Sequence, residues 1–563
     1  MAGKLHRMKI NTLGAARLVE RLYDHGFITA QGGASAWATF PGLTARYRNT
    51  LSRSVGYAKT IVPNRVALID DEGSLTYREL QEQSYRFAQY LHATQKRPIR
   101  LGVVARNSRN IVIPMVAKGY VGCSIYLLNV HSSPKQLADT IKENHINVLV
   151  IDDEFIPNLS EVVKRAQTDD ELSRLHIVRG FPDDIVRRKH QFSVLRDIVT
   201  DNITYDNVEL PTFPKHGEIV IMSSGTSGVP KGVARNEPAV PAALAAVIDG
   251  CHWYANMKVQ ITASLFHSWG WSAFNIAMLG RNTVVLRRVY DADQALSDIE
   301  KYKLDGFVSS PIFYKDMIVA DPDGTRYDTH TLSFIASSGH SLSPALIDSV
   351  HKRFGPILAS IYGSTEMSLA AVASPEDLLR DKATAGKVAY GTDLVIVDKN
   401  RRPVPTGNVG EIFLTNSMAM TRFTNPKEYV EMLGDLVAIG DYGYVDEDGY
   451  LYVLGRVDDM IIVGGENVHP QSVMETLESM PGVLEVFAKG VPDDDSFSRI
   501  AVWVKPTDNK DGKNLTEKSV QEYVRRNLAE HSVPRDVHFV QDLPRTLTGK
   551  VIPKKVDELD DIR

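Results

Sequence analysis

Residues 223–232 have the sequence SSGTSGVPKG and directly follow residues 218–222, EIVIM, an apolar run typical of a buried strand. The glycines allow backbone N–H groups to close around an anion, the hydroxyls add donors, and Lys231 adds a positive charge. This composition indicates a phosphate-binding loop. It is not a Walker A loop, because Gly232 rather than Ser or Thr follows the lysine. A flexible Gly/Ser turn would explain the glycines, but not the Pro-Lys-Gly that follows so many hydroxyls.

The sequence around this loop alternates between strand and helix patterns. Ser133 and Pro134 have the residue types of a helix N-cap and first helical position, and Leu137, Ala138 and Ile141 then recur at helical spacing. Most of the apolar runs end in loops rich in Ser, Gly or Thr. This order predicts a layered α/β architecture with ligand-binding loops at the carboxyl ends of strands. Besides 218–222, the predicted strands are 100–105, 146–151, 283–286, 332–336 and 357–361.

Composition excludes several classes of protein. The 563 residues are 24% charged and 43% hydrophobic, an ordinary globular mixture that excludes collagen-like, disordered and coiled-coil chains. The net charge of −5 gives no indication of nucleic-acid binding. Two cysteines, Cys123 and Cys251, exclude a disulfide framework and a cysteine-based zinc site. No apolar run approaches the ~20 residues of a membrane span, and the N-terminus lacks a signal-peptide core. We therefore expect a cytoplasmic protein.

The first part of the chain, residues 1–55, has the pattern of an N-terminal extension with an amphipathic helix and a linker. Leu18, Val19, Leu22 and Tyr23 share one helical stripe, which ends at Gly26 and is surrounded by basic residues. Because the stripe is short, we favour a helix that docks on its own domain. Peripheral association with an anionic membrane, at the inner membrane face, stays open as an alternative.

Further segments resemble, in order, the motifs of the adenylate-forming superfamily, which includes acyl-CoA synthetases, peptide synthetase adenylation domains and firefly luciferase. The resemblance covers nearly the whole chain from about residue 60, and so many motifs in order make coincidence implausible. It implies an α/β fold, with a large multi-subdomain N-terminal adenylation domain of layered sheets (56–455) and a small mobile α+β C-terminal domain (456–563) hinged at 456–459. The matching segments are 75–80 (LTYREL), 117–129 (AKGYVGCSIYLLN), 362–366 (YGSTE), 410–412 (GEI), 439–441 (IGD), 455–459 (GRVDD) and 544–550 (PRTLTGK).

The resemblance also implies an ATP site. Asp441 would accept hydrogen bonds from the ribose with the help of Arg456, and Glu366 would hold Mg²⁺, a hard cation that prefers oxygen ligands. The catalytic residues implied are Lys550, Thr226, Glu366 and His267. The phosphates would be bound by Ser223, Ser224, Gly225, Thr226, Ser227, Gly228 and Lys231, and the adenine flanked by Ser338, Gly339, His340, Tyr362 and Gly363, with Ser364 and Thr365 in the same motif.

Lys550 matches a lysine that enters the site while the adenylate forms. An ammonium between the substrate carboxylate and the α-phosphate lowers their mutual repulsion. The resemblance implies that the small domain then rotates about a hinge at Asp458. This rotation would remove Lys550 and bring in Gly464 and Gly465, which would help to form the coenzyme A tunnel.

His267 and Trp271 match the acyl pocket of this superfamily. Trp271 holds the position of a tryptophan that gates the acyl tunnel in long-chain fatty acyl-CoA synthetases, although an indole can also fill core space. We favour activation of a medium- to long-chain fatty acid to acyl-AMP, followed by transfer to coenzyme A.

Other functions stay open from the sequence. They are a fatty acyl-AMP ligase that serves a carrier protein, a nucleotide-binding homologue that has lost catalysis, and a luciferase-like oxygenase. The partners that we expect are small molecules and not nucleic acid, and the sequence does not distinguish a monomer from a homodimer.

Overall fold

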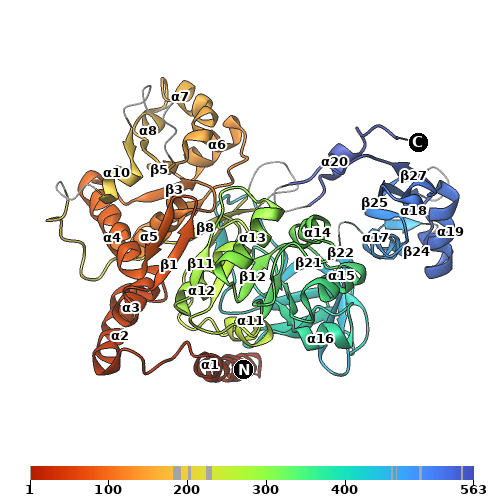
Figure 1. Ribbon diagram of the computed structural model, residues 1–563, viewed down its shortest axis with the longest axis horizontal. Coiled ribbons are helices and arrows are strands. Elements are labelled where there is room, and N and C mark those ends of the chain that lie inside the picture. The colour runs from red at the N-terminus through yellow and green to blue at the C-terminus, as the bar shows by residue number, and fades with distance from the viewer. Residues whose placement is uncertain are drawn as a thin grey trace.

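The computed structural model describes residues 2–181, 192–200, 205–223, 231–457, 459, 461–463, 466–493, 497–546 and 550–562. The described strands form three sheets (Figure 1). Two belong to the large N-terminal part of the chain. The third belongs to the small C-terminal domain, which lies at the right of Figure 1 beside α14 and α15.

The first sheet contains a parallel centre, β1-β11-β10-β12-β13-β14, and continues through antiparallel strands on one side. The carboxyl ends of β13 and β14 are neighbours, so their loops emerge together. In spatial order the strands are β17 (Asp393–Val397), β18 (Gly410–Thr415), β21 (Leu436–Val445), β22 (Tyr450–Arg456), β16 (Gly386–Val388), β15 (Ala371–Ala373), β14 (Leu358–Tyr362), β13 (Phe334–Ser337), β12 (Gly306–Ser309), β10 (Lys258–Ile261), β11 (Thr283–Val285), β1 (Val66–Asp70) and β2 (Gly73–Thr76), with β20 (Met432–Leu433) beside β21.

The second sheet is parallel except at β8, which pairs antiparallel with β9, and β9, which pairs antiparallel with β19. In spatial order its strands are β19 (Arg422–Phe423), β9 (Lys231–Arg235), β8 (Ile219–Ser223), β4 (Ser124–Leu127), β3 (Arg100–Val104), β5 (Val148–Ile151), β6 (His176–Arg179) and β7 (Ser193–Val194).

The third sheet contains both parallel and antiparallel pairs. Its strands are β24 (Glu466–Val468), β23 (Ile461–Val463), β26 (Phe497–Pro506) and β25 (Val483–Asp493), with β27 (Asp536–Phe539) beside β26.

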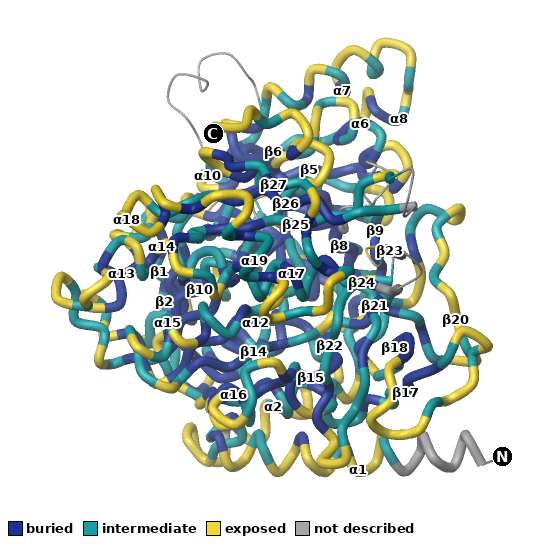
Figure 2. The backbone as a smooth tube through the Cα atoms, turned by 90° about the vertical axis from the view of Figure 1, so that its right-hand side faces the viewer, coloured by how far each residue is buried: buried dark blue, intermediate teal, exposed yellow. Residues whose placement is uncertain are grey.

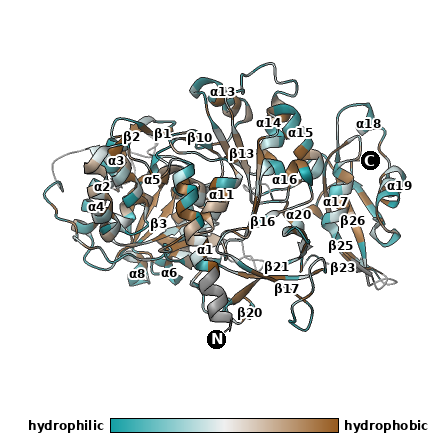
Figure 3. Ribbon diagram, turned by 90° about the horizontal axis from the view of Figure 1, so that it is seen from below, coloured by the Kyte–Doolittle hydropathy of each residue, from teal (hydrophilic) through white to brown (hydrophobic). Residues whose placement is uncertain are grey.

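Helices cover the sheets, and buried, hydrophobic residues run along the strands and along the helix faces that pack against them (Figures 2 and 3). The helices of the large domain are α1 (Ala2–Asp24), α2 (Gly33–Tyr47), α3 (Leu51–Ile61), α4 (Tyr77–Thr94), α5 (Arg109–Val121), α6 (Pro134–Glu143), η1 (Asp153–Leu159), α7 (Ser160–Arg165), α8 (Asp170–Ser173), α10 (Leu195–Thr200), α11 (Leu244–Gly250), α12 (Ser268–Leu279), α13 (Ala292–Tyr302), α14 (Pro311–Ala320), α15 (Pro344–Phe354) and α16 (Pro375–Arg380). Those of the small domain are α17 (Pro470–Glu478), α18 (Lys510–Lys513), α19 (Glu517–Asn527), η2 (Glu530–Ser532) and α20 (Pro553–Val556).

The strands and the helix start that we predicted from local sequence patterns are present in the structure. Each of the six predicted strands is present, within a few residues at its ends. Helix α6 begins as expected, because the Ser133 hydroxyl accepts the backbone N–H of Gln136 at 3.3 Å in a capping box, with Pro134 as first residue.

The N-terminal helix docks on its own domain, as favoured above. Leu18 is buried, α1 contacts α11, and the Arg21 guanidinium lies 3.3 Å from the Asp249 carboxylate (Figure 1). Val19 and Tyr23 on the same stripe are exposed, at 58% and 71%. The boundary that we place at residue 55 lies inside α3, whose Leu51, Val55 and Ala58 are part of the main core.

Nothing in the described part of the chain forms a helix with the length and hydrophobicity that crossing a membrane requires.

Candidate active site

Asp441 is held by two residues from different strands. The Tyr362 hydroxyl at the end of β14 donates to one carboxylate oxygen, and Arg456 Nη1 donates to the other at 3.2 Å. Asp441 is 8% exposed, and this burial raises the pKa of its carboxyl, against the opposing effects of Tyr362 and Arg456. The carboxylate is therefore fixed in orientation, as an acceptor for ribose hydroxyls must be.

The loop after β14 carries the YGSTE motif in a tight turn. A side chain on Gly363 would place its Cβ 2.1 Å from the Ser368 carbonyl oxygen, so this position requires glycine. The Ser364 hydroxyl accepts the Met367 N–H at 3.2 Å and closes the turn. Glu366 is half-buried, and no hydrogen bond or ion pair to its carboxylate is present within the described ranges. An unpaired carboxylate of this kind suits a hard metal ion.

Arg235, which the sequence analysis did not select, supports this turn. It is 2% exposed at the end of β9, and its guanidinium donates to the Thr365 carbonyl oxygen and the Ser368 hydroxyl. Burial lowers the pKa of Arg235 to about 10, with the nearby Glu366 charge opposing the shift. No local sequence signal identifies this residue, because its partners at 365 and 368 are distant in the chain.

A second loop, after β13, lies beside the first. The Ser338 hydroxyl donates to the Ile361 carbonyl oxygen at 2.8 Å, which ties this loop to β14. Gly339 has a φ of 93°, a conformation that favours glycine. Among the described residues, the imidazole of His340 has hydrogen-bond partners only on Ser341. The structure therefore brings residues 338–340 and 362–363 together, as the resemblance implies.

Lys550 faces this site from the small domain. Its backbone N–H donates to the Thr546 hydroxyl at 3.2 Å. Surrounding protein atoms, and then Arg456, lower the pKa of Lys550, while the charges of Asp441 and Glu366 oppose this shift. Lys550 in turn helps to lower the pKa of His267 and His340. Its ammonium is thus close enough to respond to the two carboxylates of the large domain.

Several contacts join the small domain to the large domain. On α14, the Lys315 ammonium donates to the Leu484 carbonyl oxygen of the small domain and lies 3.8 Å from the Glu485 carboxylate. Gln471 on α17 donates to the Ser341 hydroxyl at 2.8 Å. Glu485 also pairs with Arg545 at 2.8 Å, close to the turn that carries Lys550.

The predicted phosphate loop connects two antiparallel strands. Ser223 ends β8 and pairs with Lys231, the first residue of β9. The Lys231 ammonium lies 2.5 Å from the Glu428 carboxylate. The predicted residues outside the described part of the chain are Ser224, Gly225, Thr226, Ser227, Gly228, Asp458, Gly464 and Gly465.

His267 is the N-cap residue of α12, and Trp271 lies on the first turn of this helix. Burial, followed by the charges of Lys550 and His131, lowers the pKa of His267 to about 4, so the imidazole is neutral at pH 7. Trp271, one turn along, lines a pocket that continues along the helix. His267, which responds to the charge of Lys550, and Trp271, which lines the pocket, are thus four residues apart on one face of the chain segment that enters α12.

The low pKa of His267 has a consequence for stability. The unfolded imidazole binds a proton near its usual pKa of about 6.5, whereas the folded one resists protonation down to about 4. Its contribution to stability is thus fully present above pH ~6.5 and is lost as the pH falls toward 4. We expect the Tm of the wild type to fall more between pH 7.5 and pH 5 than the Tm of His267→Gln. Equal falls in Tm would contradict this expectation.

Comparison with known proteins identifies the family. Residues 58–423 match the family model described as AMP-binding enzyme, and residues 474–550 match the AMP-binding enzyme C-terminal domain. The chain belongs to the AMP-binding enzyme family. The predicted resemblance, the α/β class with a large and a small domain, and the assignment to the AMP-forming acid–thiol ligases are confirmed.

The relatives of this AMP-binding enzyme have different substrates in their names. An indoleacetate–CoA ligase of Aromatoleum aromaticum is 31% identical over 62% of this chain and 68% of its own length. A fatty acid–[acyl-carrier-protein] ligase of Streptomyces coeruleorubidus is 26% identical over 90% and 96%. The crystal structure of an anthranilate CoA ligase with anthranoyl-AMP superposes with a TM-score of 0.79 at 22% identity, covering 90% and 96%, which supports the fold.

Proposed function

We propose that this AMP-binding enzyme activates a medium- to long-chain carboxylic acid with ATP and transfers the acyl group to coenzyme A. The observation that supports the first step is the position of Lys550, which faces Asp441 and Glu366 across the two domains. A carboxylate and a triphosphate repel each other, and an ammonium between them lowers that repulsion as the carboxylate oxygen attacks the α-phosphorus. Pyrophosphate leaves as the acyl–AMP bond forms.

The residues for the nucleotide fit this role. The oriented carboxylate of Asp441 would accept hydrogen bonds from the two ribose hydroxyls. The loops at 338–340 and 362–363, which lie side by side, would flank the adenine. Glu366 would hold Mg²⁺, which supplies charge neutralisation for the phosphates when bound. Lys231 and Ser223 flank the predicted phosphate loop.

The length of the acid is inferred from α12. The pocket beyond Trp271 runs along this helix past Asn275 to Leu279, and twelve residues from His267 to Leu279 rise by roughly 18 Å. This distance suits an extended chain better than a small aromatic acid. Coenzyme A as acceptor is supported by CoA ligases among the relatives, and a carrier protein by the relative from Streptomyces.

The test measures AMP release from ATP with a panel of carboxylic acids, with and without coenzyme A. We expect turnover that depends on coenzyme A and is highest for extended acids. Adenylate that accumulates regardless of coenzyme A would favour a carrier-protein acceptor instead. No AMP release with any acid would contradict the proposed function.

Trp271 provides a prediction about substrate length. In Trp271→Ala the preferred chain length should change, because the indole lines the pocket between His267 and Asn275, while the KM for ATP should stay near the wild-type value. The measurement is kcat/KM for a series of acids. Such a truncation costs ~3–5 kcal/mol when the side chain is core packing, so the Tm is measured first. A uniform loss for every acid together with a lower Tm would assign Trp271 to core packing.

A further inference from the structure

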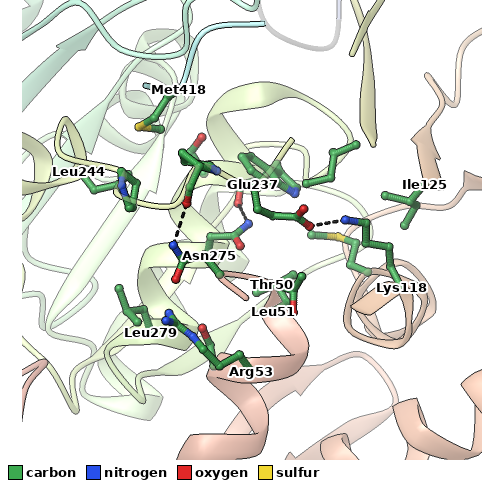
Figure 4. A pocket seen from close by; sticks show the side chains of 18 residues that line it. Thr50, Leu51, Arg53, Lys118, Ile125, Glu237, Leu244, Asn275, Leu279 and Met418 are labelled. Atoms are coloured by element: carbon green, nitrogen blue, oxygen red, sulfur yellow. Dashed lines mark hydrogen bonds and ion pairs between the residues drawn. The ribbon is translucent and has the colours of Figure 1, made fainter. Parts of the chain in front are cut away.

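The pocket beyond Trp271 contains a buried arginine that has no anionic partner. Arg53, on α3, is 9% exposed and lines the pocket near Leu279 (Figure 4). In the part of the chain that the structure describes, no ion pair or hydrogen bond satisfies its guanidinium. Its contact is with the Phe40 ring, whose centroid lies 5.5 Å from Cζ. Burial lowers the pKa of Arg53 to about 10, and the group therefore stays charged at pH 7.

The other charged groups of the pocket neutralise each other. The Lys118 ammonium and the Glu237 carboxylate form an ion pair whose side chains are 2% and 8% exposed. Figure 4 shows this pair on the side of the pocket away from Arg53. The lining as described therefore has one net positive charge, located at Arg53.

Most of the remaining lining is apolar. Leu51, Ile125, Leu244 and Met418 contribute from α3, β4, α11 and the segment after β18 (Figure 4), and Met115 contributes from α5. Asn49 uses its amide N–H groups on the carbonyl oxygens of residues 238 and 239, each at 2.7 Å. The pocket thus presents an apolar wall and one charged group without an ionic partner, Arg53, near Leu279.

An unpaired buried charge is costly, and an anion in the pocket would remove that cost. A guanidinium binds a carboxylate with two parallel N–H···O bonds, a geometry that an ammonium does not reproduce. The apolar wall suits a hydrocarbon chain between the reacting carboxylate at His267 and a second anionic group at Arg53.

We propose that the pocket holds the far end of the acid substrate and that this end carries a second carboxylate, which Arg53 binds. The preferred substrates are then long α,ω-dicarboxylic acids rather than simple fatty acids. This inference rests on the proposed function for the identity of the occupant, and it narrows the substrate class.

The experiment measures binding by calorimetry, so that it does not depend on turnover. The probes are linear α,ω-dicarboxylic acids of eight to fourteen carbons and the monocarboxylic acids of the same lengths. The proteins are the wild type, Arg53→Met, Arg53→Lys and Arg78→Met, a control at an exposed arginine of α4.

We expect the wild type and the control to bind one length of diacid at least about tenfold more tightly than the matching monoacid. In Arg53→Met the affinity for that diacid should fall by about 10–100-fold, the range for hydrogen bonds to charged groups. In Arg53→Lys the loss of affinity should be smaller, because the positive charge is kept. Some loss should remain, because an ammonium lacks the planar guanidinium that forms two parallel hydrogen bonds with a carboxylate.

A wild type that binds no diacid, or binds the monoacid as tightly, would overturn the inference. So would an equal loss for both acids in Arg53→Met. If Arg53→Met does not fold, the wild-type preference and Arg53→Lys decide the question. AMP release with monoacids in the presence of coenzyme A would show that the proposed function survives such a failure.

Discussion

Replacing Lys550 with alanine should slow acyl-adenylate formation by about 10²–10³-fold, the usual effect of removing one preorganised charge-stabilising donor. The ammonium faces Asp441 and Glu366, where the negative charges of the two substrates would meet. The fold should survive, because Lys550 is exposed and exposed substitutions change stability by within ~0.5 kcal/mol. The measurement is the single-turnover rate of adenylate formation.

The second half-reaction distinguishes a catalytic lysine from a structural one. With chemically supplied acyl-AMP and coenzyme A, Lys550→Ala should form thioester at close to the wild-type rate. Lys554→Ala, at an exposed lysine of α20, is the matched control for both steps. Equal losses in the two half-reactions would remove the main support for an alternation of domains about the predicted hinge at Asp458. No loss in either would show that the role implied by the resemblance is wrong.

Replacing Arg235 with methionine should slow adenylate formation by about 10²-fold, the effect that a misplacement of about 1 Å can have on catalysis. The side chain of Arg235 binds the turn that carries Glu366. It positions Glu366 through the Thr365 carbonyl oxygen and the Ser368 hydroxyl, both of which would lose their donor. We also expect the Mg²⁺ concentration that gives half-maximal rate to rise, which a merely structural role would not cause.

The control for Arg235 lies on the neighbouring strand. Arg422 on β19 is also an arginine, but it is 51% exposed and pairs with Glu218 at the surface. Arg422→Met should leave both the rate and the Mg²⁺ dependence unchanged. Loss of two buried donors costs ~1–3 kcal/mol each, so Arg235→Met should also lower the Tm. A lower Tm with an unchanged Mg²⁺ dependence would show that Arg235 supports the fold alone.

Local signals predicted much of this molecule because they depend on near neighbours in the chain. The serine and proline that begin α6 satisfy its first N–H groups wherever the helix lies, and apolar runs such as 146–151 form strands that are buried on both faces. Asp441, Tyr362 and Lys550 were found through motifs, and the structure brings them to one site.

Arg235 and Arg53 were not predicted, and the reason is the same for both. An arginine at the end of a strand or in a helix is usually exposed, and its burial here depends on segments that are distant in the chain. Arg235 meets residues 365–368, and Arg53 meets a pocket built from α5, α12 and the segment after β9. Only the tertiary structure shows which arginine side chains are buried away from solvent.

The contact of Lys315 with Glu485 would affect the equilibrium between the two domain orientations that the resemblance implies. If the small domain rotates, Lys315 loses Leu484 and Glu485, but Glu485 keeps Arg545, which belongs to its own domain. The buried Glu485 carboxylate then keeps a counterion, and Lys315 becomes accessible to water, so that separating the two leaves neither charge buried and unpaired and costs little. Such a small difference allows both orientations to be populated at once, so that the bound substrate rather than the empty protein decides which one predominates.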